Sequence, residues 1–255
     1  MAPPSPLASA LRADGWDVRT AAGEDWARTL ADAGAAEADV LHLHDVPALH
    51  EAASRVAPGV PVVAHLHGAP SEPMHAWARA CERVILASVA HRSGLDPERC
   101  AVIPDGFDPA DVEPHRIDGD ETAVVVSGED VAEIFERAQP GFARRARLVV
   151  ASEPPLADAH IVLLAPLVEG MARGLAVIAA APADVVEHGE TGWVVQPDDP
   201  MGLVNALVHA VNCPIERQRR GSRAAATALE RYTWAAVAAQ VAEQYDAALG
   251  AAVEL

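Results

Sequence analysis

The sequence contains no lysine, because all nineteen of its basic residues are arginine. This absence excludes lysine chemistry, including Schiff bases and a lysine clamp on phosphate. An anionic ligand must therefore be held by arginine, backbone N–H groups or helix N-termini. The 37 acidic residues give a net charge of −18. Such a surface repels nucleic acid, so we expect no nucleic-acid partner.

Long apolar runs and paired cysteines are also missing. The best apolar run, at 160–168, is half as long as the roughly 18 residues that a membrane span needs. The N-terminus does not combine a basic region with an apolar stretch, as an export signal would. The three cysteines are odd in number and far apart, which fits a reducing compartment. We therefore expect a cytoplasmic protein without a transmembrane segment.

Short, continuously apolar runs alternate with helical patterns along the whole chain. Strands buried on both faces look like this, so the pattern predicts parallel sheets built from βαβ units. A helix over LVNALVHAVN follows the start signal DDP, where Asp198 or Asp199 can cap and Pro200 lies in the first turn. The expected strands are 39–44, 61–67, 83–88, 100–104, 122–128, 147–152, 160–166 and 175–180.

A polar segment rich in proline and glycine, DGFDPADVEPHRIDGDE at 105–121, separates four of these strands from the other four. Two similar series joined by one linker predict an α/β protein with two Rossmann-like, doubly wound lobes. We place the first lobe at 1–112 and the second at 113–235. Ligands of such folds bind beyond the carboxyl ends of the strands.

A doubled HxH pattern ends two of the predicted strands. His42 and His44 belong to one strand, His65 and His67 to the other, and Asp45 follows the first pair. Residues two apart share a strand face, so two adjacent strands could gather four imidazoles and a carboxylate, as a divalent metal requires. No HxHxDH or HExxH pattern completes such a site. A metal-dependent hydrolase therefore competes with two other interpretations: histidines packed beneath helices, or a single functional histidine at a strand end.

Other candidates follow strands in both halves. Gly106 and Gly128 could allow a ligand to approach the backbone or could simply form turns. In VEGMARG, Glu169 lies in the first turn of a short predicted helix, and Arg173 is one of few cations near a strand end.

Read in order, four segments resemble one family. They are PLASALRADGWDVRTAAG, DVLHLHDVPALHEAASRVAPGVPVVAHLHG, ACERVILASVAHRSGLDPERCAVIPDGFDP and EGMARGLAVIAAAPADVVEHGETGWVVQPDDPMGLVNAL. They are similar to the retaining, nucleotide-sugar-dependent glycosyltransferases of the GT-B fold, family-4 type. The first segment resembles a helix and a strand of that family, and the closing helix at 236–255 looks like the one that crosses back onto the first lobe. The resemblance implies sugar transfer from a nucleotide-sugar donor to a small-molecule or glycan acceptor, with retention and without a metal or other cofactor.

The resemblance also implies roles for individual residues. The histidine of HLHG, His67, would be catalytic beside the transferred sugar. Glu169 would contact the nucleotide ribose, and the helix that begins near it would offer N–H groups to the diphosphate. The implied donor-binding residues are Glu169, Gly170, Arg173, Gly128, Gly106 and Asp105.

The sequence departs from the family at several of its binding motifs. Ile161 stands where the first acid of the family's acidic pair is usual, and Glu129 and Asp130 follow VVVSG in place of a phosphate clamp. The resemblance begins at the helix that follows the family's first strand and glycine-rich loop. We hypothesise that Arg173 replaces the lost cations. A degenerate, non-catalytic binding or partner subunit is the alternative, and an uncovered sheet edge makes a homodimer plausible.

Overall fold

A computed structural model describes residues 5–23, 25–45, 47–68, 71–113, 121–126, 132–150, 156, 158–164 and 167–253. The chain divides into two compact units. Unit 1 consists of Met1–Asp105 and Trp234–Leu255, and unit 2 consists of Gly106–Thr233. The chain thus leaves unit 1 after Asp105 and returns to it for the last helix.

Unit 1 contains a parallel sheet with the order β1-β2-β3-β4, which is also the order along the chain. Its strands are β1 (Leu41–His44), β2 (Val62–Leu66), β3 (Arg83–Leu86) and β4 (Cys100–Val102). Its helices are α1 (Pro6–Ala13), α2 (Trp26–Asp32), α3 (Pro47–Val56), α4 (Glu72–Ala80) and α9 (Trp234–Val253). Short 3₁₀ turns lie at Ala35–Glu37, Val89–Arg92 and Pro97–Arg99.

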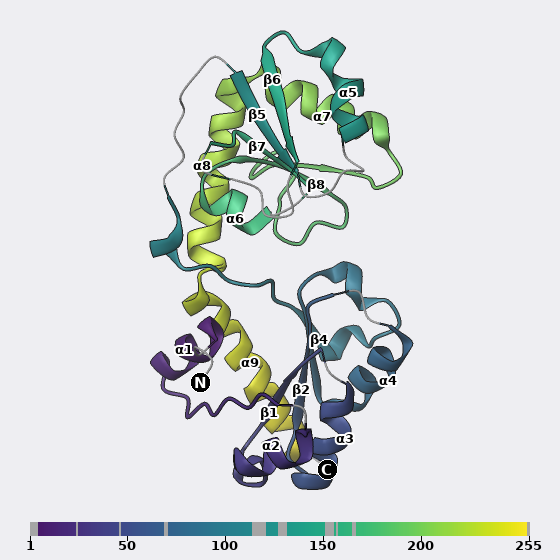
Figure 1. Cartoon of the computed structure of the whole chain (residues 1–255), viewed down its shortest axis with the longest axis vertical. Helices are drawn as coiled ribbons and strands as arrows, with labels where there is room; N and C mark the ends of the chain where they lie inside the picture. Colours follow the sequence, from purple (N-terminus) through teal and green to yellow (C-terminus); the bar gives the residue numbers. More distant parts are fainter. Residues whose placement is uncertain are drawn as a thin grey trace. The chain divides into compact units, whose positions relative to one another are not determined.

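Helices cover both faces of this sheet, which explains why its strands are continuously apolar. Ala64 and Leu66 of β2 face the cluster formed with α2, α3 and α4, whereas Val63 faces the cluster formed with α1 and α9. Figure 1 shows α1 and α9 on one side of the strands, and α3 and α4 on the other. The face toward α9 is also the one on which the paired histidines lie.

Unit 2 contains a five-stranded parallel sheet with the order β6-β5-β7-β8-β9. Its strands are β5 (Glu121–Val126), β6 (Arg145–Val150), β7 (Ile161–Leu163), β8 (Ala176–Ala180) and β9 (Trp193–Val195). Its helices are α5 (Ala132–Ala138), α6 (Leu167–Ala172), α7 (Pro200–Asn212) and α8 (Pro214–Arg231), with 3₁₀ turns at Pro109–Asp111 and Gln139–Gly141. Helices α5 and α7 pack on one face and α6 and α8 on the other.

The strand order of unit 2 reverses at β5, because the chain first adds β6 on one side of it and then β7 on the other. In open α/β sheets, ligands bind at such a switch point, beyond the carboxyl ends of the strands. Helix α6 follows β7 there. The sheet order therefore selects the α6 end of β7 as the place for a ligand of unit 2.

Two glycines allow close packing around α6 and α8. Gly170 lies against β7, since a Cβ there would come within 2.8 Å of the Val162 side chain. On α8, a Cβ at Gly221 would lie 2.0 Å from the carbonyl oxygen of Gly174. Helix α8 thus approaches the backbone before β8 at a distance that only glycine permits.

The eight predicted strands and the α/β class are confirmed. The predicted helix start at the DDP signal is confirmed as well, because Asp199 caps α7 by accepting the backbone N–H of Gly202 at 2.7 Å. Within the described residues, no helix is both long and apolar enough to cross a membrane.

One expectation from the resemblance is wrong. The segment after α1 was expected to form a strand, but residues 15–23 are not part of the sheet. The side chains of Trp16 and Val18 both pack toward α9, and the Arg12 guanidinium donates to the Val18 carbonyl at 2.6 Å. These contacts occupy the Val18 carbonyl and hold the segment against a helix.

Candidate functional site

Four imidazoles lie together where β1 and β2 end. Neighbouring parallel strands place His44 directly beside His65, and the period of two puts His42 and His67 on the same face. The rings form two hydrogen-bonded pairs. His42 Nε2 lies 3.2 Å from His65 Nδ1, and His44 Nδ1 lies 2.9 Å from His67 Nε2. One pair stacks on the other, with ring centroids 4.4 Å apart for His42 and His44 and 4.1 Å apart for His65 and His67.

The inner pair, His42 and His65, is anchored by the last helix. The Tyr245 hydroxyl of α9 lies 2.7 Å from His42 Nδ1, so a line of hydrogen bonds runs from Tyr245 through His42 to His65. Burial lowers the pKa of both histidines well below the usual value, and the neighbouring imidazoles lower it further. Both rings are therefore neutral at physiological pH. The Nε2 atom of His65 is buried and has no hydrogen-bond partner.

The outer pair, His44 and His67, ends on a carboxylate. His67 Nδ1 lies 3.3 Å from Asp105 Oδ1, on the loop that follows β4. The hydrogen bond to Asp105 raises the pKa of His67, and the same bond lowers the pKa of Asp105. Burial and the neighbouring His67 bring the pKa of His44 down to about 4. Of the four imidazoles, His67 is thus the one that most readily carries a proton.

Asp45 holds the loop of His67 rather than a histidine ring. Its carboxylate accepts the backbone N–H of His67 at 3.0 Å, and its own N–H donates to the His65 carbonyl at 3.1 Å. Its backbone is left-handed, with φ of 44°, a conformation that aspartate tolerates better than most residues. The fixed geometry just after β1 therefore positions the strand end that bears His67.

The structure brings together only some of the predicted residues. His67 and Asp105 form one pair in unit 1, whereas Gly106 belongs to unit 2. Glu169 and Arg173 lie on and just after α6 at the switch point, and Gly170 is buried there in helix–strand packing. Gly128 lies outside the described residues.

Arg173 is unusual among the described arginines of unit 2. Its Nε atom is buried without a hydrogen-bond partner, and Nη1 reaches only the Glu169 carbonyl, at 3.4 Å. No carboxylate within the described residues forms a salt bridge with it. Arg220, by contrast, pairs with Glu216 at 2.7 Å and stacks on Trp193. A cation with unused donors at a switch point is suited to an anionic ligand.

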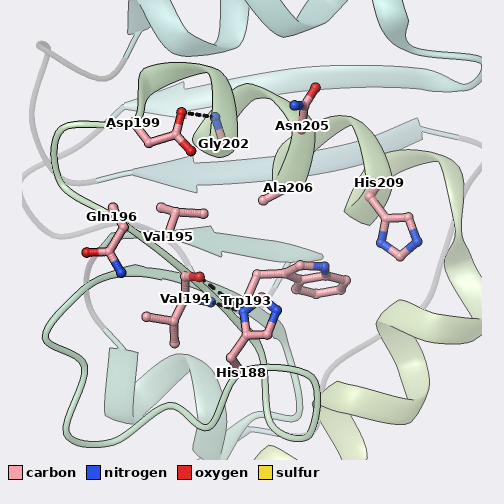
Figure 2. A pocket seen from close by; sticks show the side chains of 10 residues that line it. All are labelled: His188, Trp193, Val194, Val195, Gln196, Asp199, Gly202, Asn205, Ala206 and His209. Atoms are coloured by element: carbon pink, nitrogen blue, oxygen red, sulfur yellow. Dashed lines mark hydrogen bonds between the residues drawn. The ribbon is translucent and has the colours of Figure 1, made fainter.

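A hollow of about 430 Å³ lies between β9 and α7 (Figure 2). Two of its polar side chains are bonded within the protein. His188 Nδ1 lies 3.0 Å from the backbone of Val194, and Asp199 caps α7. None of the catalytic or donor-binding residues predicted from the sequence lines it, and we assign it no role.

The sequence names Asp105 as a donor-binding residue but does not connect it with the histidines, and it gives Tyr245 no site role. Both come from distant segments, and the available signals were an aspartate just after the fourth strand and a tyrosine in an alanine-rich helix.

Comparisons with known proteins agree with this architecture. Residues 144–212 match the family described as glycosyl transferases group 1. A phosphatidyl-myo-inositol mannosyltransferase of Mycobacterium leprae is 37% identical over 83 residues, which are 31% of this chain and 22% of that protein. The chain therefore matches less than a quarter of the length of this curated relative.

Solved structures resemble the chain over most of its length. Anabaena HepE, solved with UDP and glucose, has a TM-score of 0.65 at 19% identity, covering 85% of this chain and 80% of that one. Sucrose-phosphate synthase from Thermosynechococcus elongatus has a TM-score of 0.68 at 15% identity, covering 96% and 92%. The chain thus has the GT-B fold, and its second unit contains a segment that matches the group 1 glycosyl transferases.

Proposed function

We propose that this protein is a glycosyltransferase that moves a sugar from a nucleotide-sugar donor to the hydroxyl of a small-molecule or glycan acceptor, with retention and without a metal. The observation that carries the proposal is the position of α6. It follows β7 at the switch point of unit 2, inside the segment that matches the group 1 family. HepE and its bound UDP support the choice of donor class.

In this proposal, the donor is held by unit 2. Glu169 hydrogen-bonds the ribose, and Arg173 meets the diphosphate with the donors that the protein leaves unused. The leaving diphosphate gains negative charge as the bond between the sugar C1 and its oxygen breaks, so a fixed cation stabilises the transition state more than the ground state. Arginine is the permanently charged side chain available for this role, because the chain contains no lysine.

His67 supplies the proton chemistry. Asp105 accepts a hydrogen bond from Nδ1–H of His67. The other ring nitrogen, Nε2, is hydrogen-bonded to His44, and a substrate group can replace His44 there. From there His67 hydrogen-bonds a sugar hydroxyl or the departing phosphate. The side chain is 32% exposed, so a ligand can reach it, and its raised pKa suits a group that donates a hydrogen bond to an anion.

A cytoplasmic location completes the proposal, since the three cysteines are free. The protein acts either alone or as a homodimer or partner subunit.

Thermal unfolding with UDP, GDP and ADP, followed by assays of the matching nucleotide sugars in EDTA, tests the function. We expect one nucleotide to raise the Tm and its sugar derivative to be consumed. Stabilisation without any transfer would support the alternative, a non-catalytic binding subunit. Failure of all three nucleotides to stabilise the protein would contradict the proposal.

A further inference from the structure

One histidine of the inner pair, His65, lies beside one histidine of the outer pair, His67, and both are near the Asp105 carboxylate. Together these three residues could bind one metal ion. One ligand atom each from His65, His67 and Asp105 lies within 4.8 Å of the other two. In the inner pair, the Nδ1 of His65 is taken by His42, so Nε2 is the atom that remains. In the outer pair, His67 Nδ1 and Asp105 Oδ1 are already 3.3 Å apart. This is close to the separation of about 3.3 Å between ligands of a tetrahedral zinc ion.

The unpartnered nitrogen of His65 is the independent sign of a ligand. The residue is only 2% exposed, and a buried polar atom without a partner is costly and rare. An ion bound at Nε2 would satisfy it.

The proton positions that a metal needs are available in both pairs. If the Nδ1–H of His65 donates to His42, and His42 in turn donates to the Tyr245 oxygen, Nε2 of His65 carries a free lone pair. The hydroxyl of Tyr245 allows this direction because it both donates and accepts. In the outer pair, Nε2–H of His67 donates to His44 and frees Nδ1. Each ligating imidazole then donates its other N–H to a neighbour, as metal-bound histidines usually do.

We propose that His65 Nε2, His67 Nδ1 and the Asp105 carboxylate form a site for a divalent transition metal, of which Zn²⁺ fits best. Two imidazoles and a carboxylate leave a fourth position open to water or another ligand. The rings of His65 and His67 are stacked with 20° between their planes, so binding tilts them toward a common point. His67 and Asp105, the more exposed members, supply this movement.

The site has a consequence for transfer that rests on the proposed function. Zn²⁺ and the hydrogen bond between His67 and Asp105 use the same nitrogen, so they exclude each other. The metal-loaded protein would therefore be the inactive form, and chelation would restore transfer.

Zinc titration of the metal-stripped full chain tests the site without any assay of transfer. Isothermal titration calorimetry should give one Zn²⁺ per chain, and Co²⁺ should give the visible bands of a four-coordinate ion. Asp105→Asn and His65→Asn should each weaken binding by about tenfold or more. His50→Ala, on α3, is the control and should bind as the wild type does.

Asp105 is exposed, so its variant keeps the test valid if His65→Asn fails to fold. Absence of a stoichiometric ion, or equal affinity in Asp105→Asn and wild type, would overturn the site. If zinc binds as expected but neither the loaded nor the stripped protein transfers sugar, the proposed function fails and the metal site stands.

Discussion

The ring of His67 and the carboxylate of Asp105 are joined across 3.3 Å, although 37 residues separate them in the chain. His67 directly follows β2, and Asp105 lies on the loop after β4. Their hydrogen bond raises the pKa of His67 and lowers that of Asp105, so the charged pair predominates between the two shifted values.

Asp105→Asn should remove this pairing and leave a pH-dependent signature. The pKa of His67 is raised from 6.5, so the stability that its charged form contributes is complete below pH 6.5 and is lost as the pH rises through the folded-state pKa. The pKa of Asp105 is lowered from 3.8, so the stability that its carboxylate contributes is complete above pH 3.8 and is lost as the pH falls through the folded-state pKa. The Tm difference between wild type and variant should be largest between these limits, measured by calorimetry in EDTA.

Asp96→Asn is the control for that experiment, because Asp96 caps a 3₁₀ turn in the same unit and asparagine can cap as well. Its Tm difference should not follow the same pH profile. NMR titration should show a lower pKa for His67 in Asp105→Asn, and an unchanged pKa would refute the pairing.

His67→Ala should abolish transfer without unfolding the protein. Acid–base groups contribute about 10²–10⁴ in rate, so kcat should fall by at least about a hundredfold. The side chain is partly exposed, which limits the structural damage. His50→Ala should keep wild-type turnover. Full activity of His67→Ala would remove the residue from the mechanism.

Arg173→Ala should weaken binding of the nucleoside diphosphate by about tenfold or more, because a charge-assisted hydrogen bond is lost. The matched control is Arg137→Ala on α5, whose guanidinium already pairs with Glu133. Calorimetric titration with the stabilising nucleotide measures both. Equal affinities of wild type and Arg173→Ala would exclude Arg173 from the donor site.

Gly221→Ala should destabilise unit 2, since its Cβ would come 2.0 Å from the Gly174 carbonyl oxygen. Overpacking of this kind costs about 1–3 kcal/mol of unfolding free energy. Gly250→Ala is the opposite case, because nothing lies within 4 Å of a Cβ on that exposed position of α9. It should gain up to about 1 kcal/mol. Similar Tm shifts in the two variants would contradict the close contact between α8 and the Gly174 carbonyl, which precedes β8.

Most of the fold could be predicted from local pattern. Strands such as 61–67 are buried on both faces, so their hydrophobicity alone marks them, and the DDP signal marks the start of α7. β9 was missed because Trp193–Val195 is three residues long and follows a turn, which gives no periodicity to detect. The segment after α1 was misassigned because its apolar residues serve a helix contact and not a ladder.

The site was only half predictable. The period of two within β1 and β2 indicated that the histidines would share a face, and they do. Which carboxylate would meet them depends on the tertiary fold. Asp45 was adjacent in sequence but turns to a backbone N–H, whereas Asp105 arrives through two further strands. Tyr245 comes from beyond the whole of unit 2.

The return of α9 to unit 1 sets the order in which the molecule can be completed during synthesis. Val237, Val241 and Tyr245 form part of the cluster that covers Val63 and Ile85. These residues leave the ribosome only after all of unit 2 has been made. Until then, one sheet face of the nascent first unit lacks the cover of α9, and His42 lacks its hydroxyl partner. The site of unit 1 is therefore assembled last, although most of it is translated first.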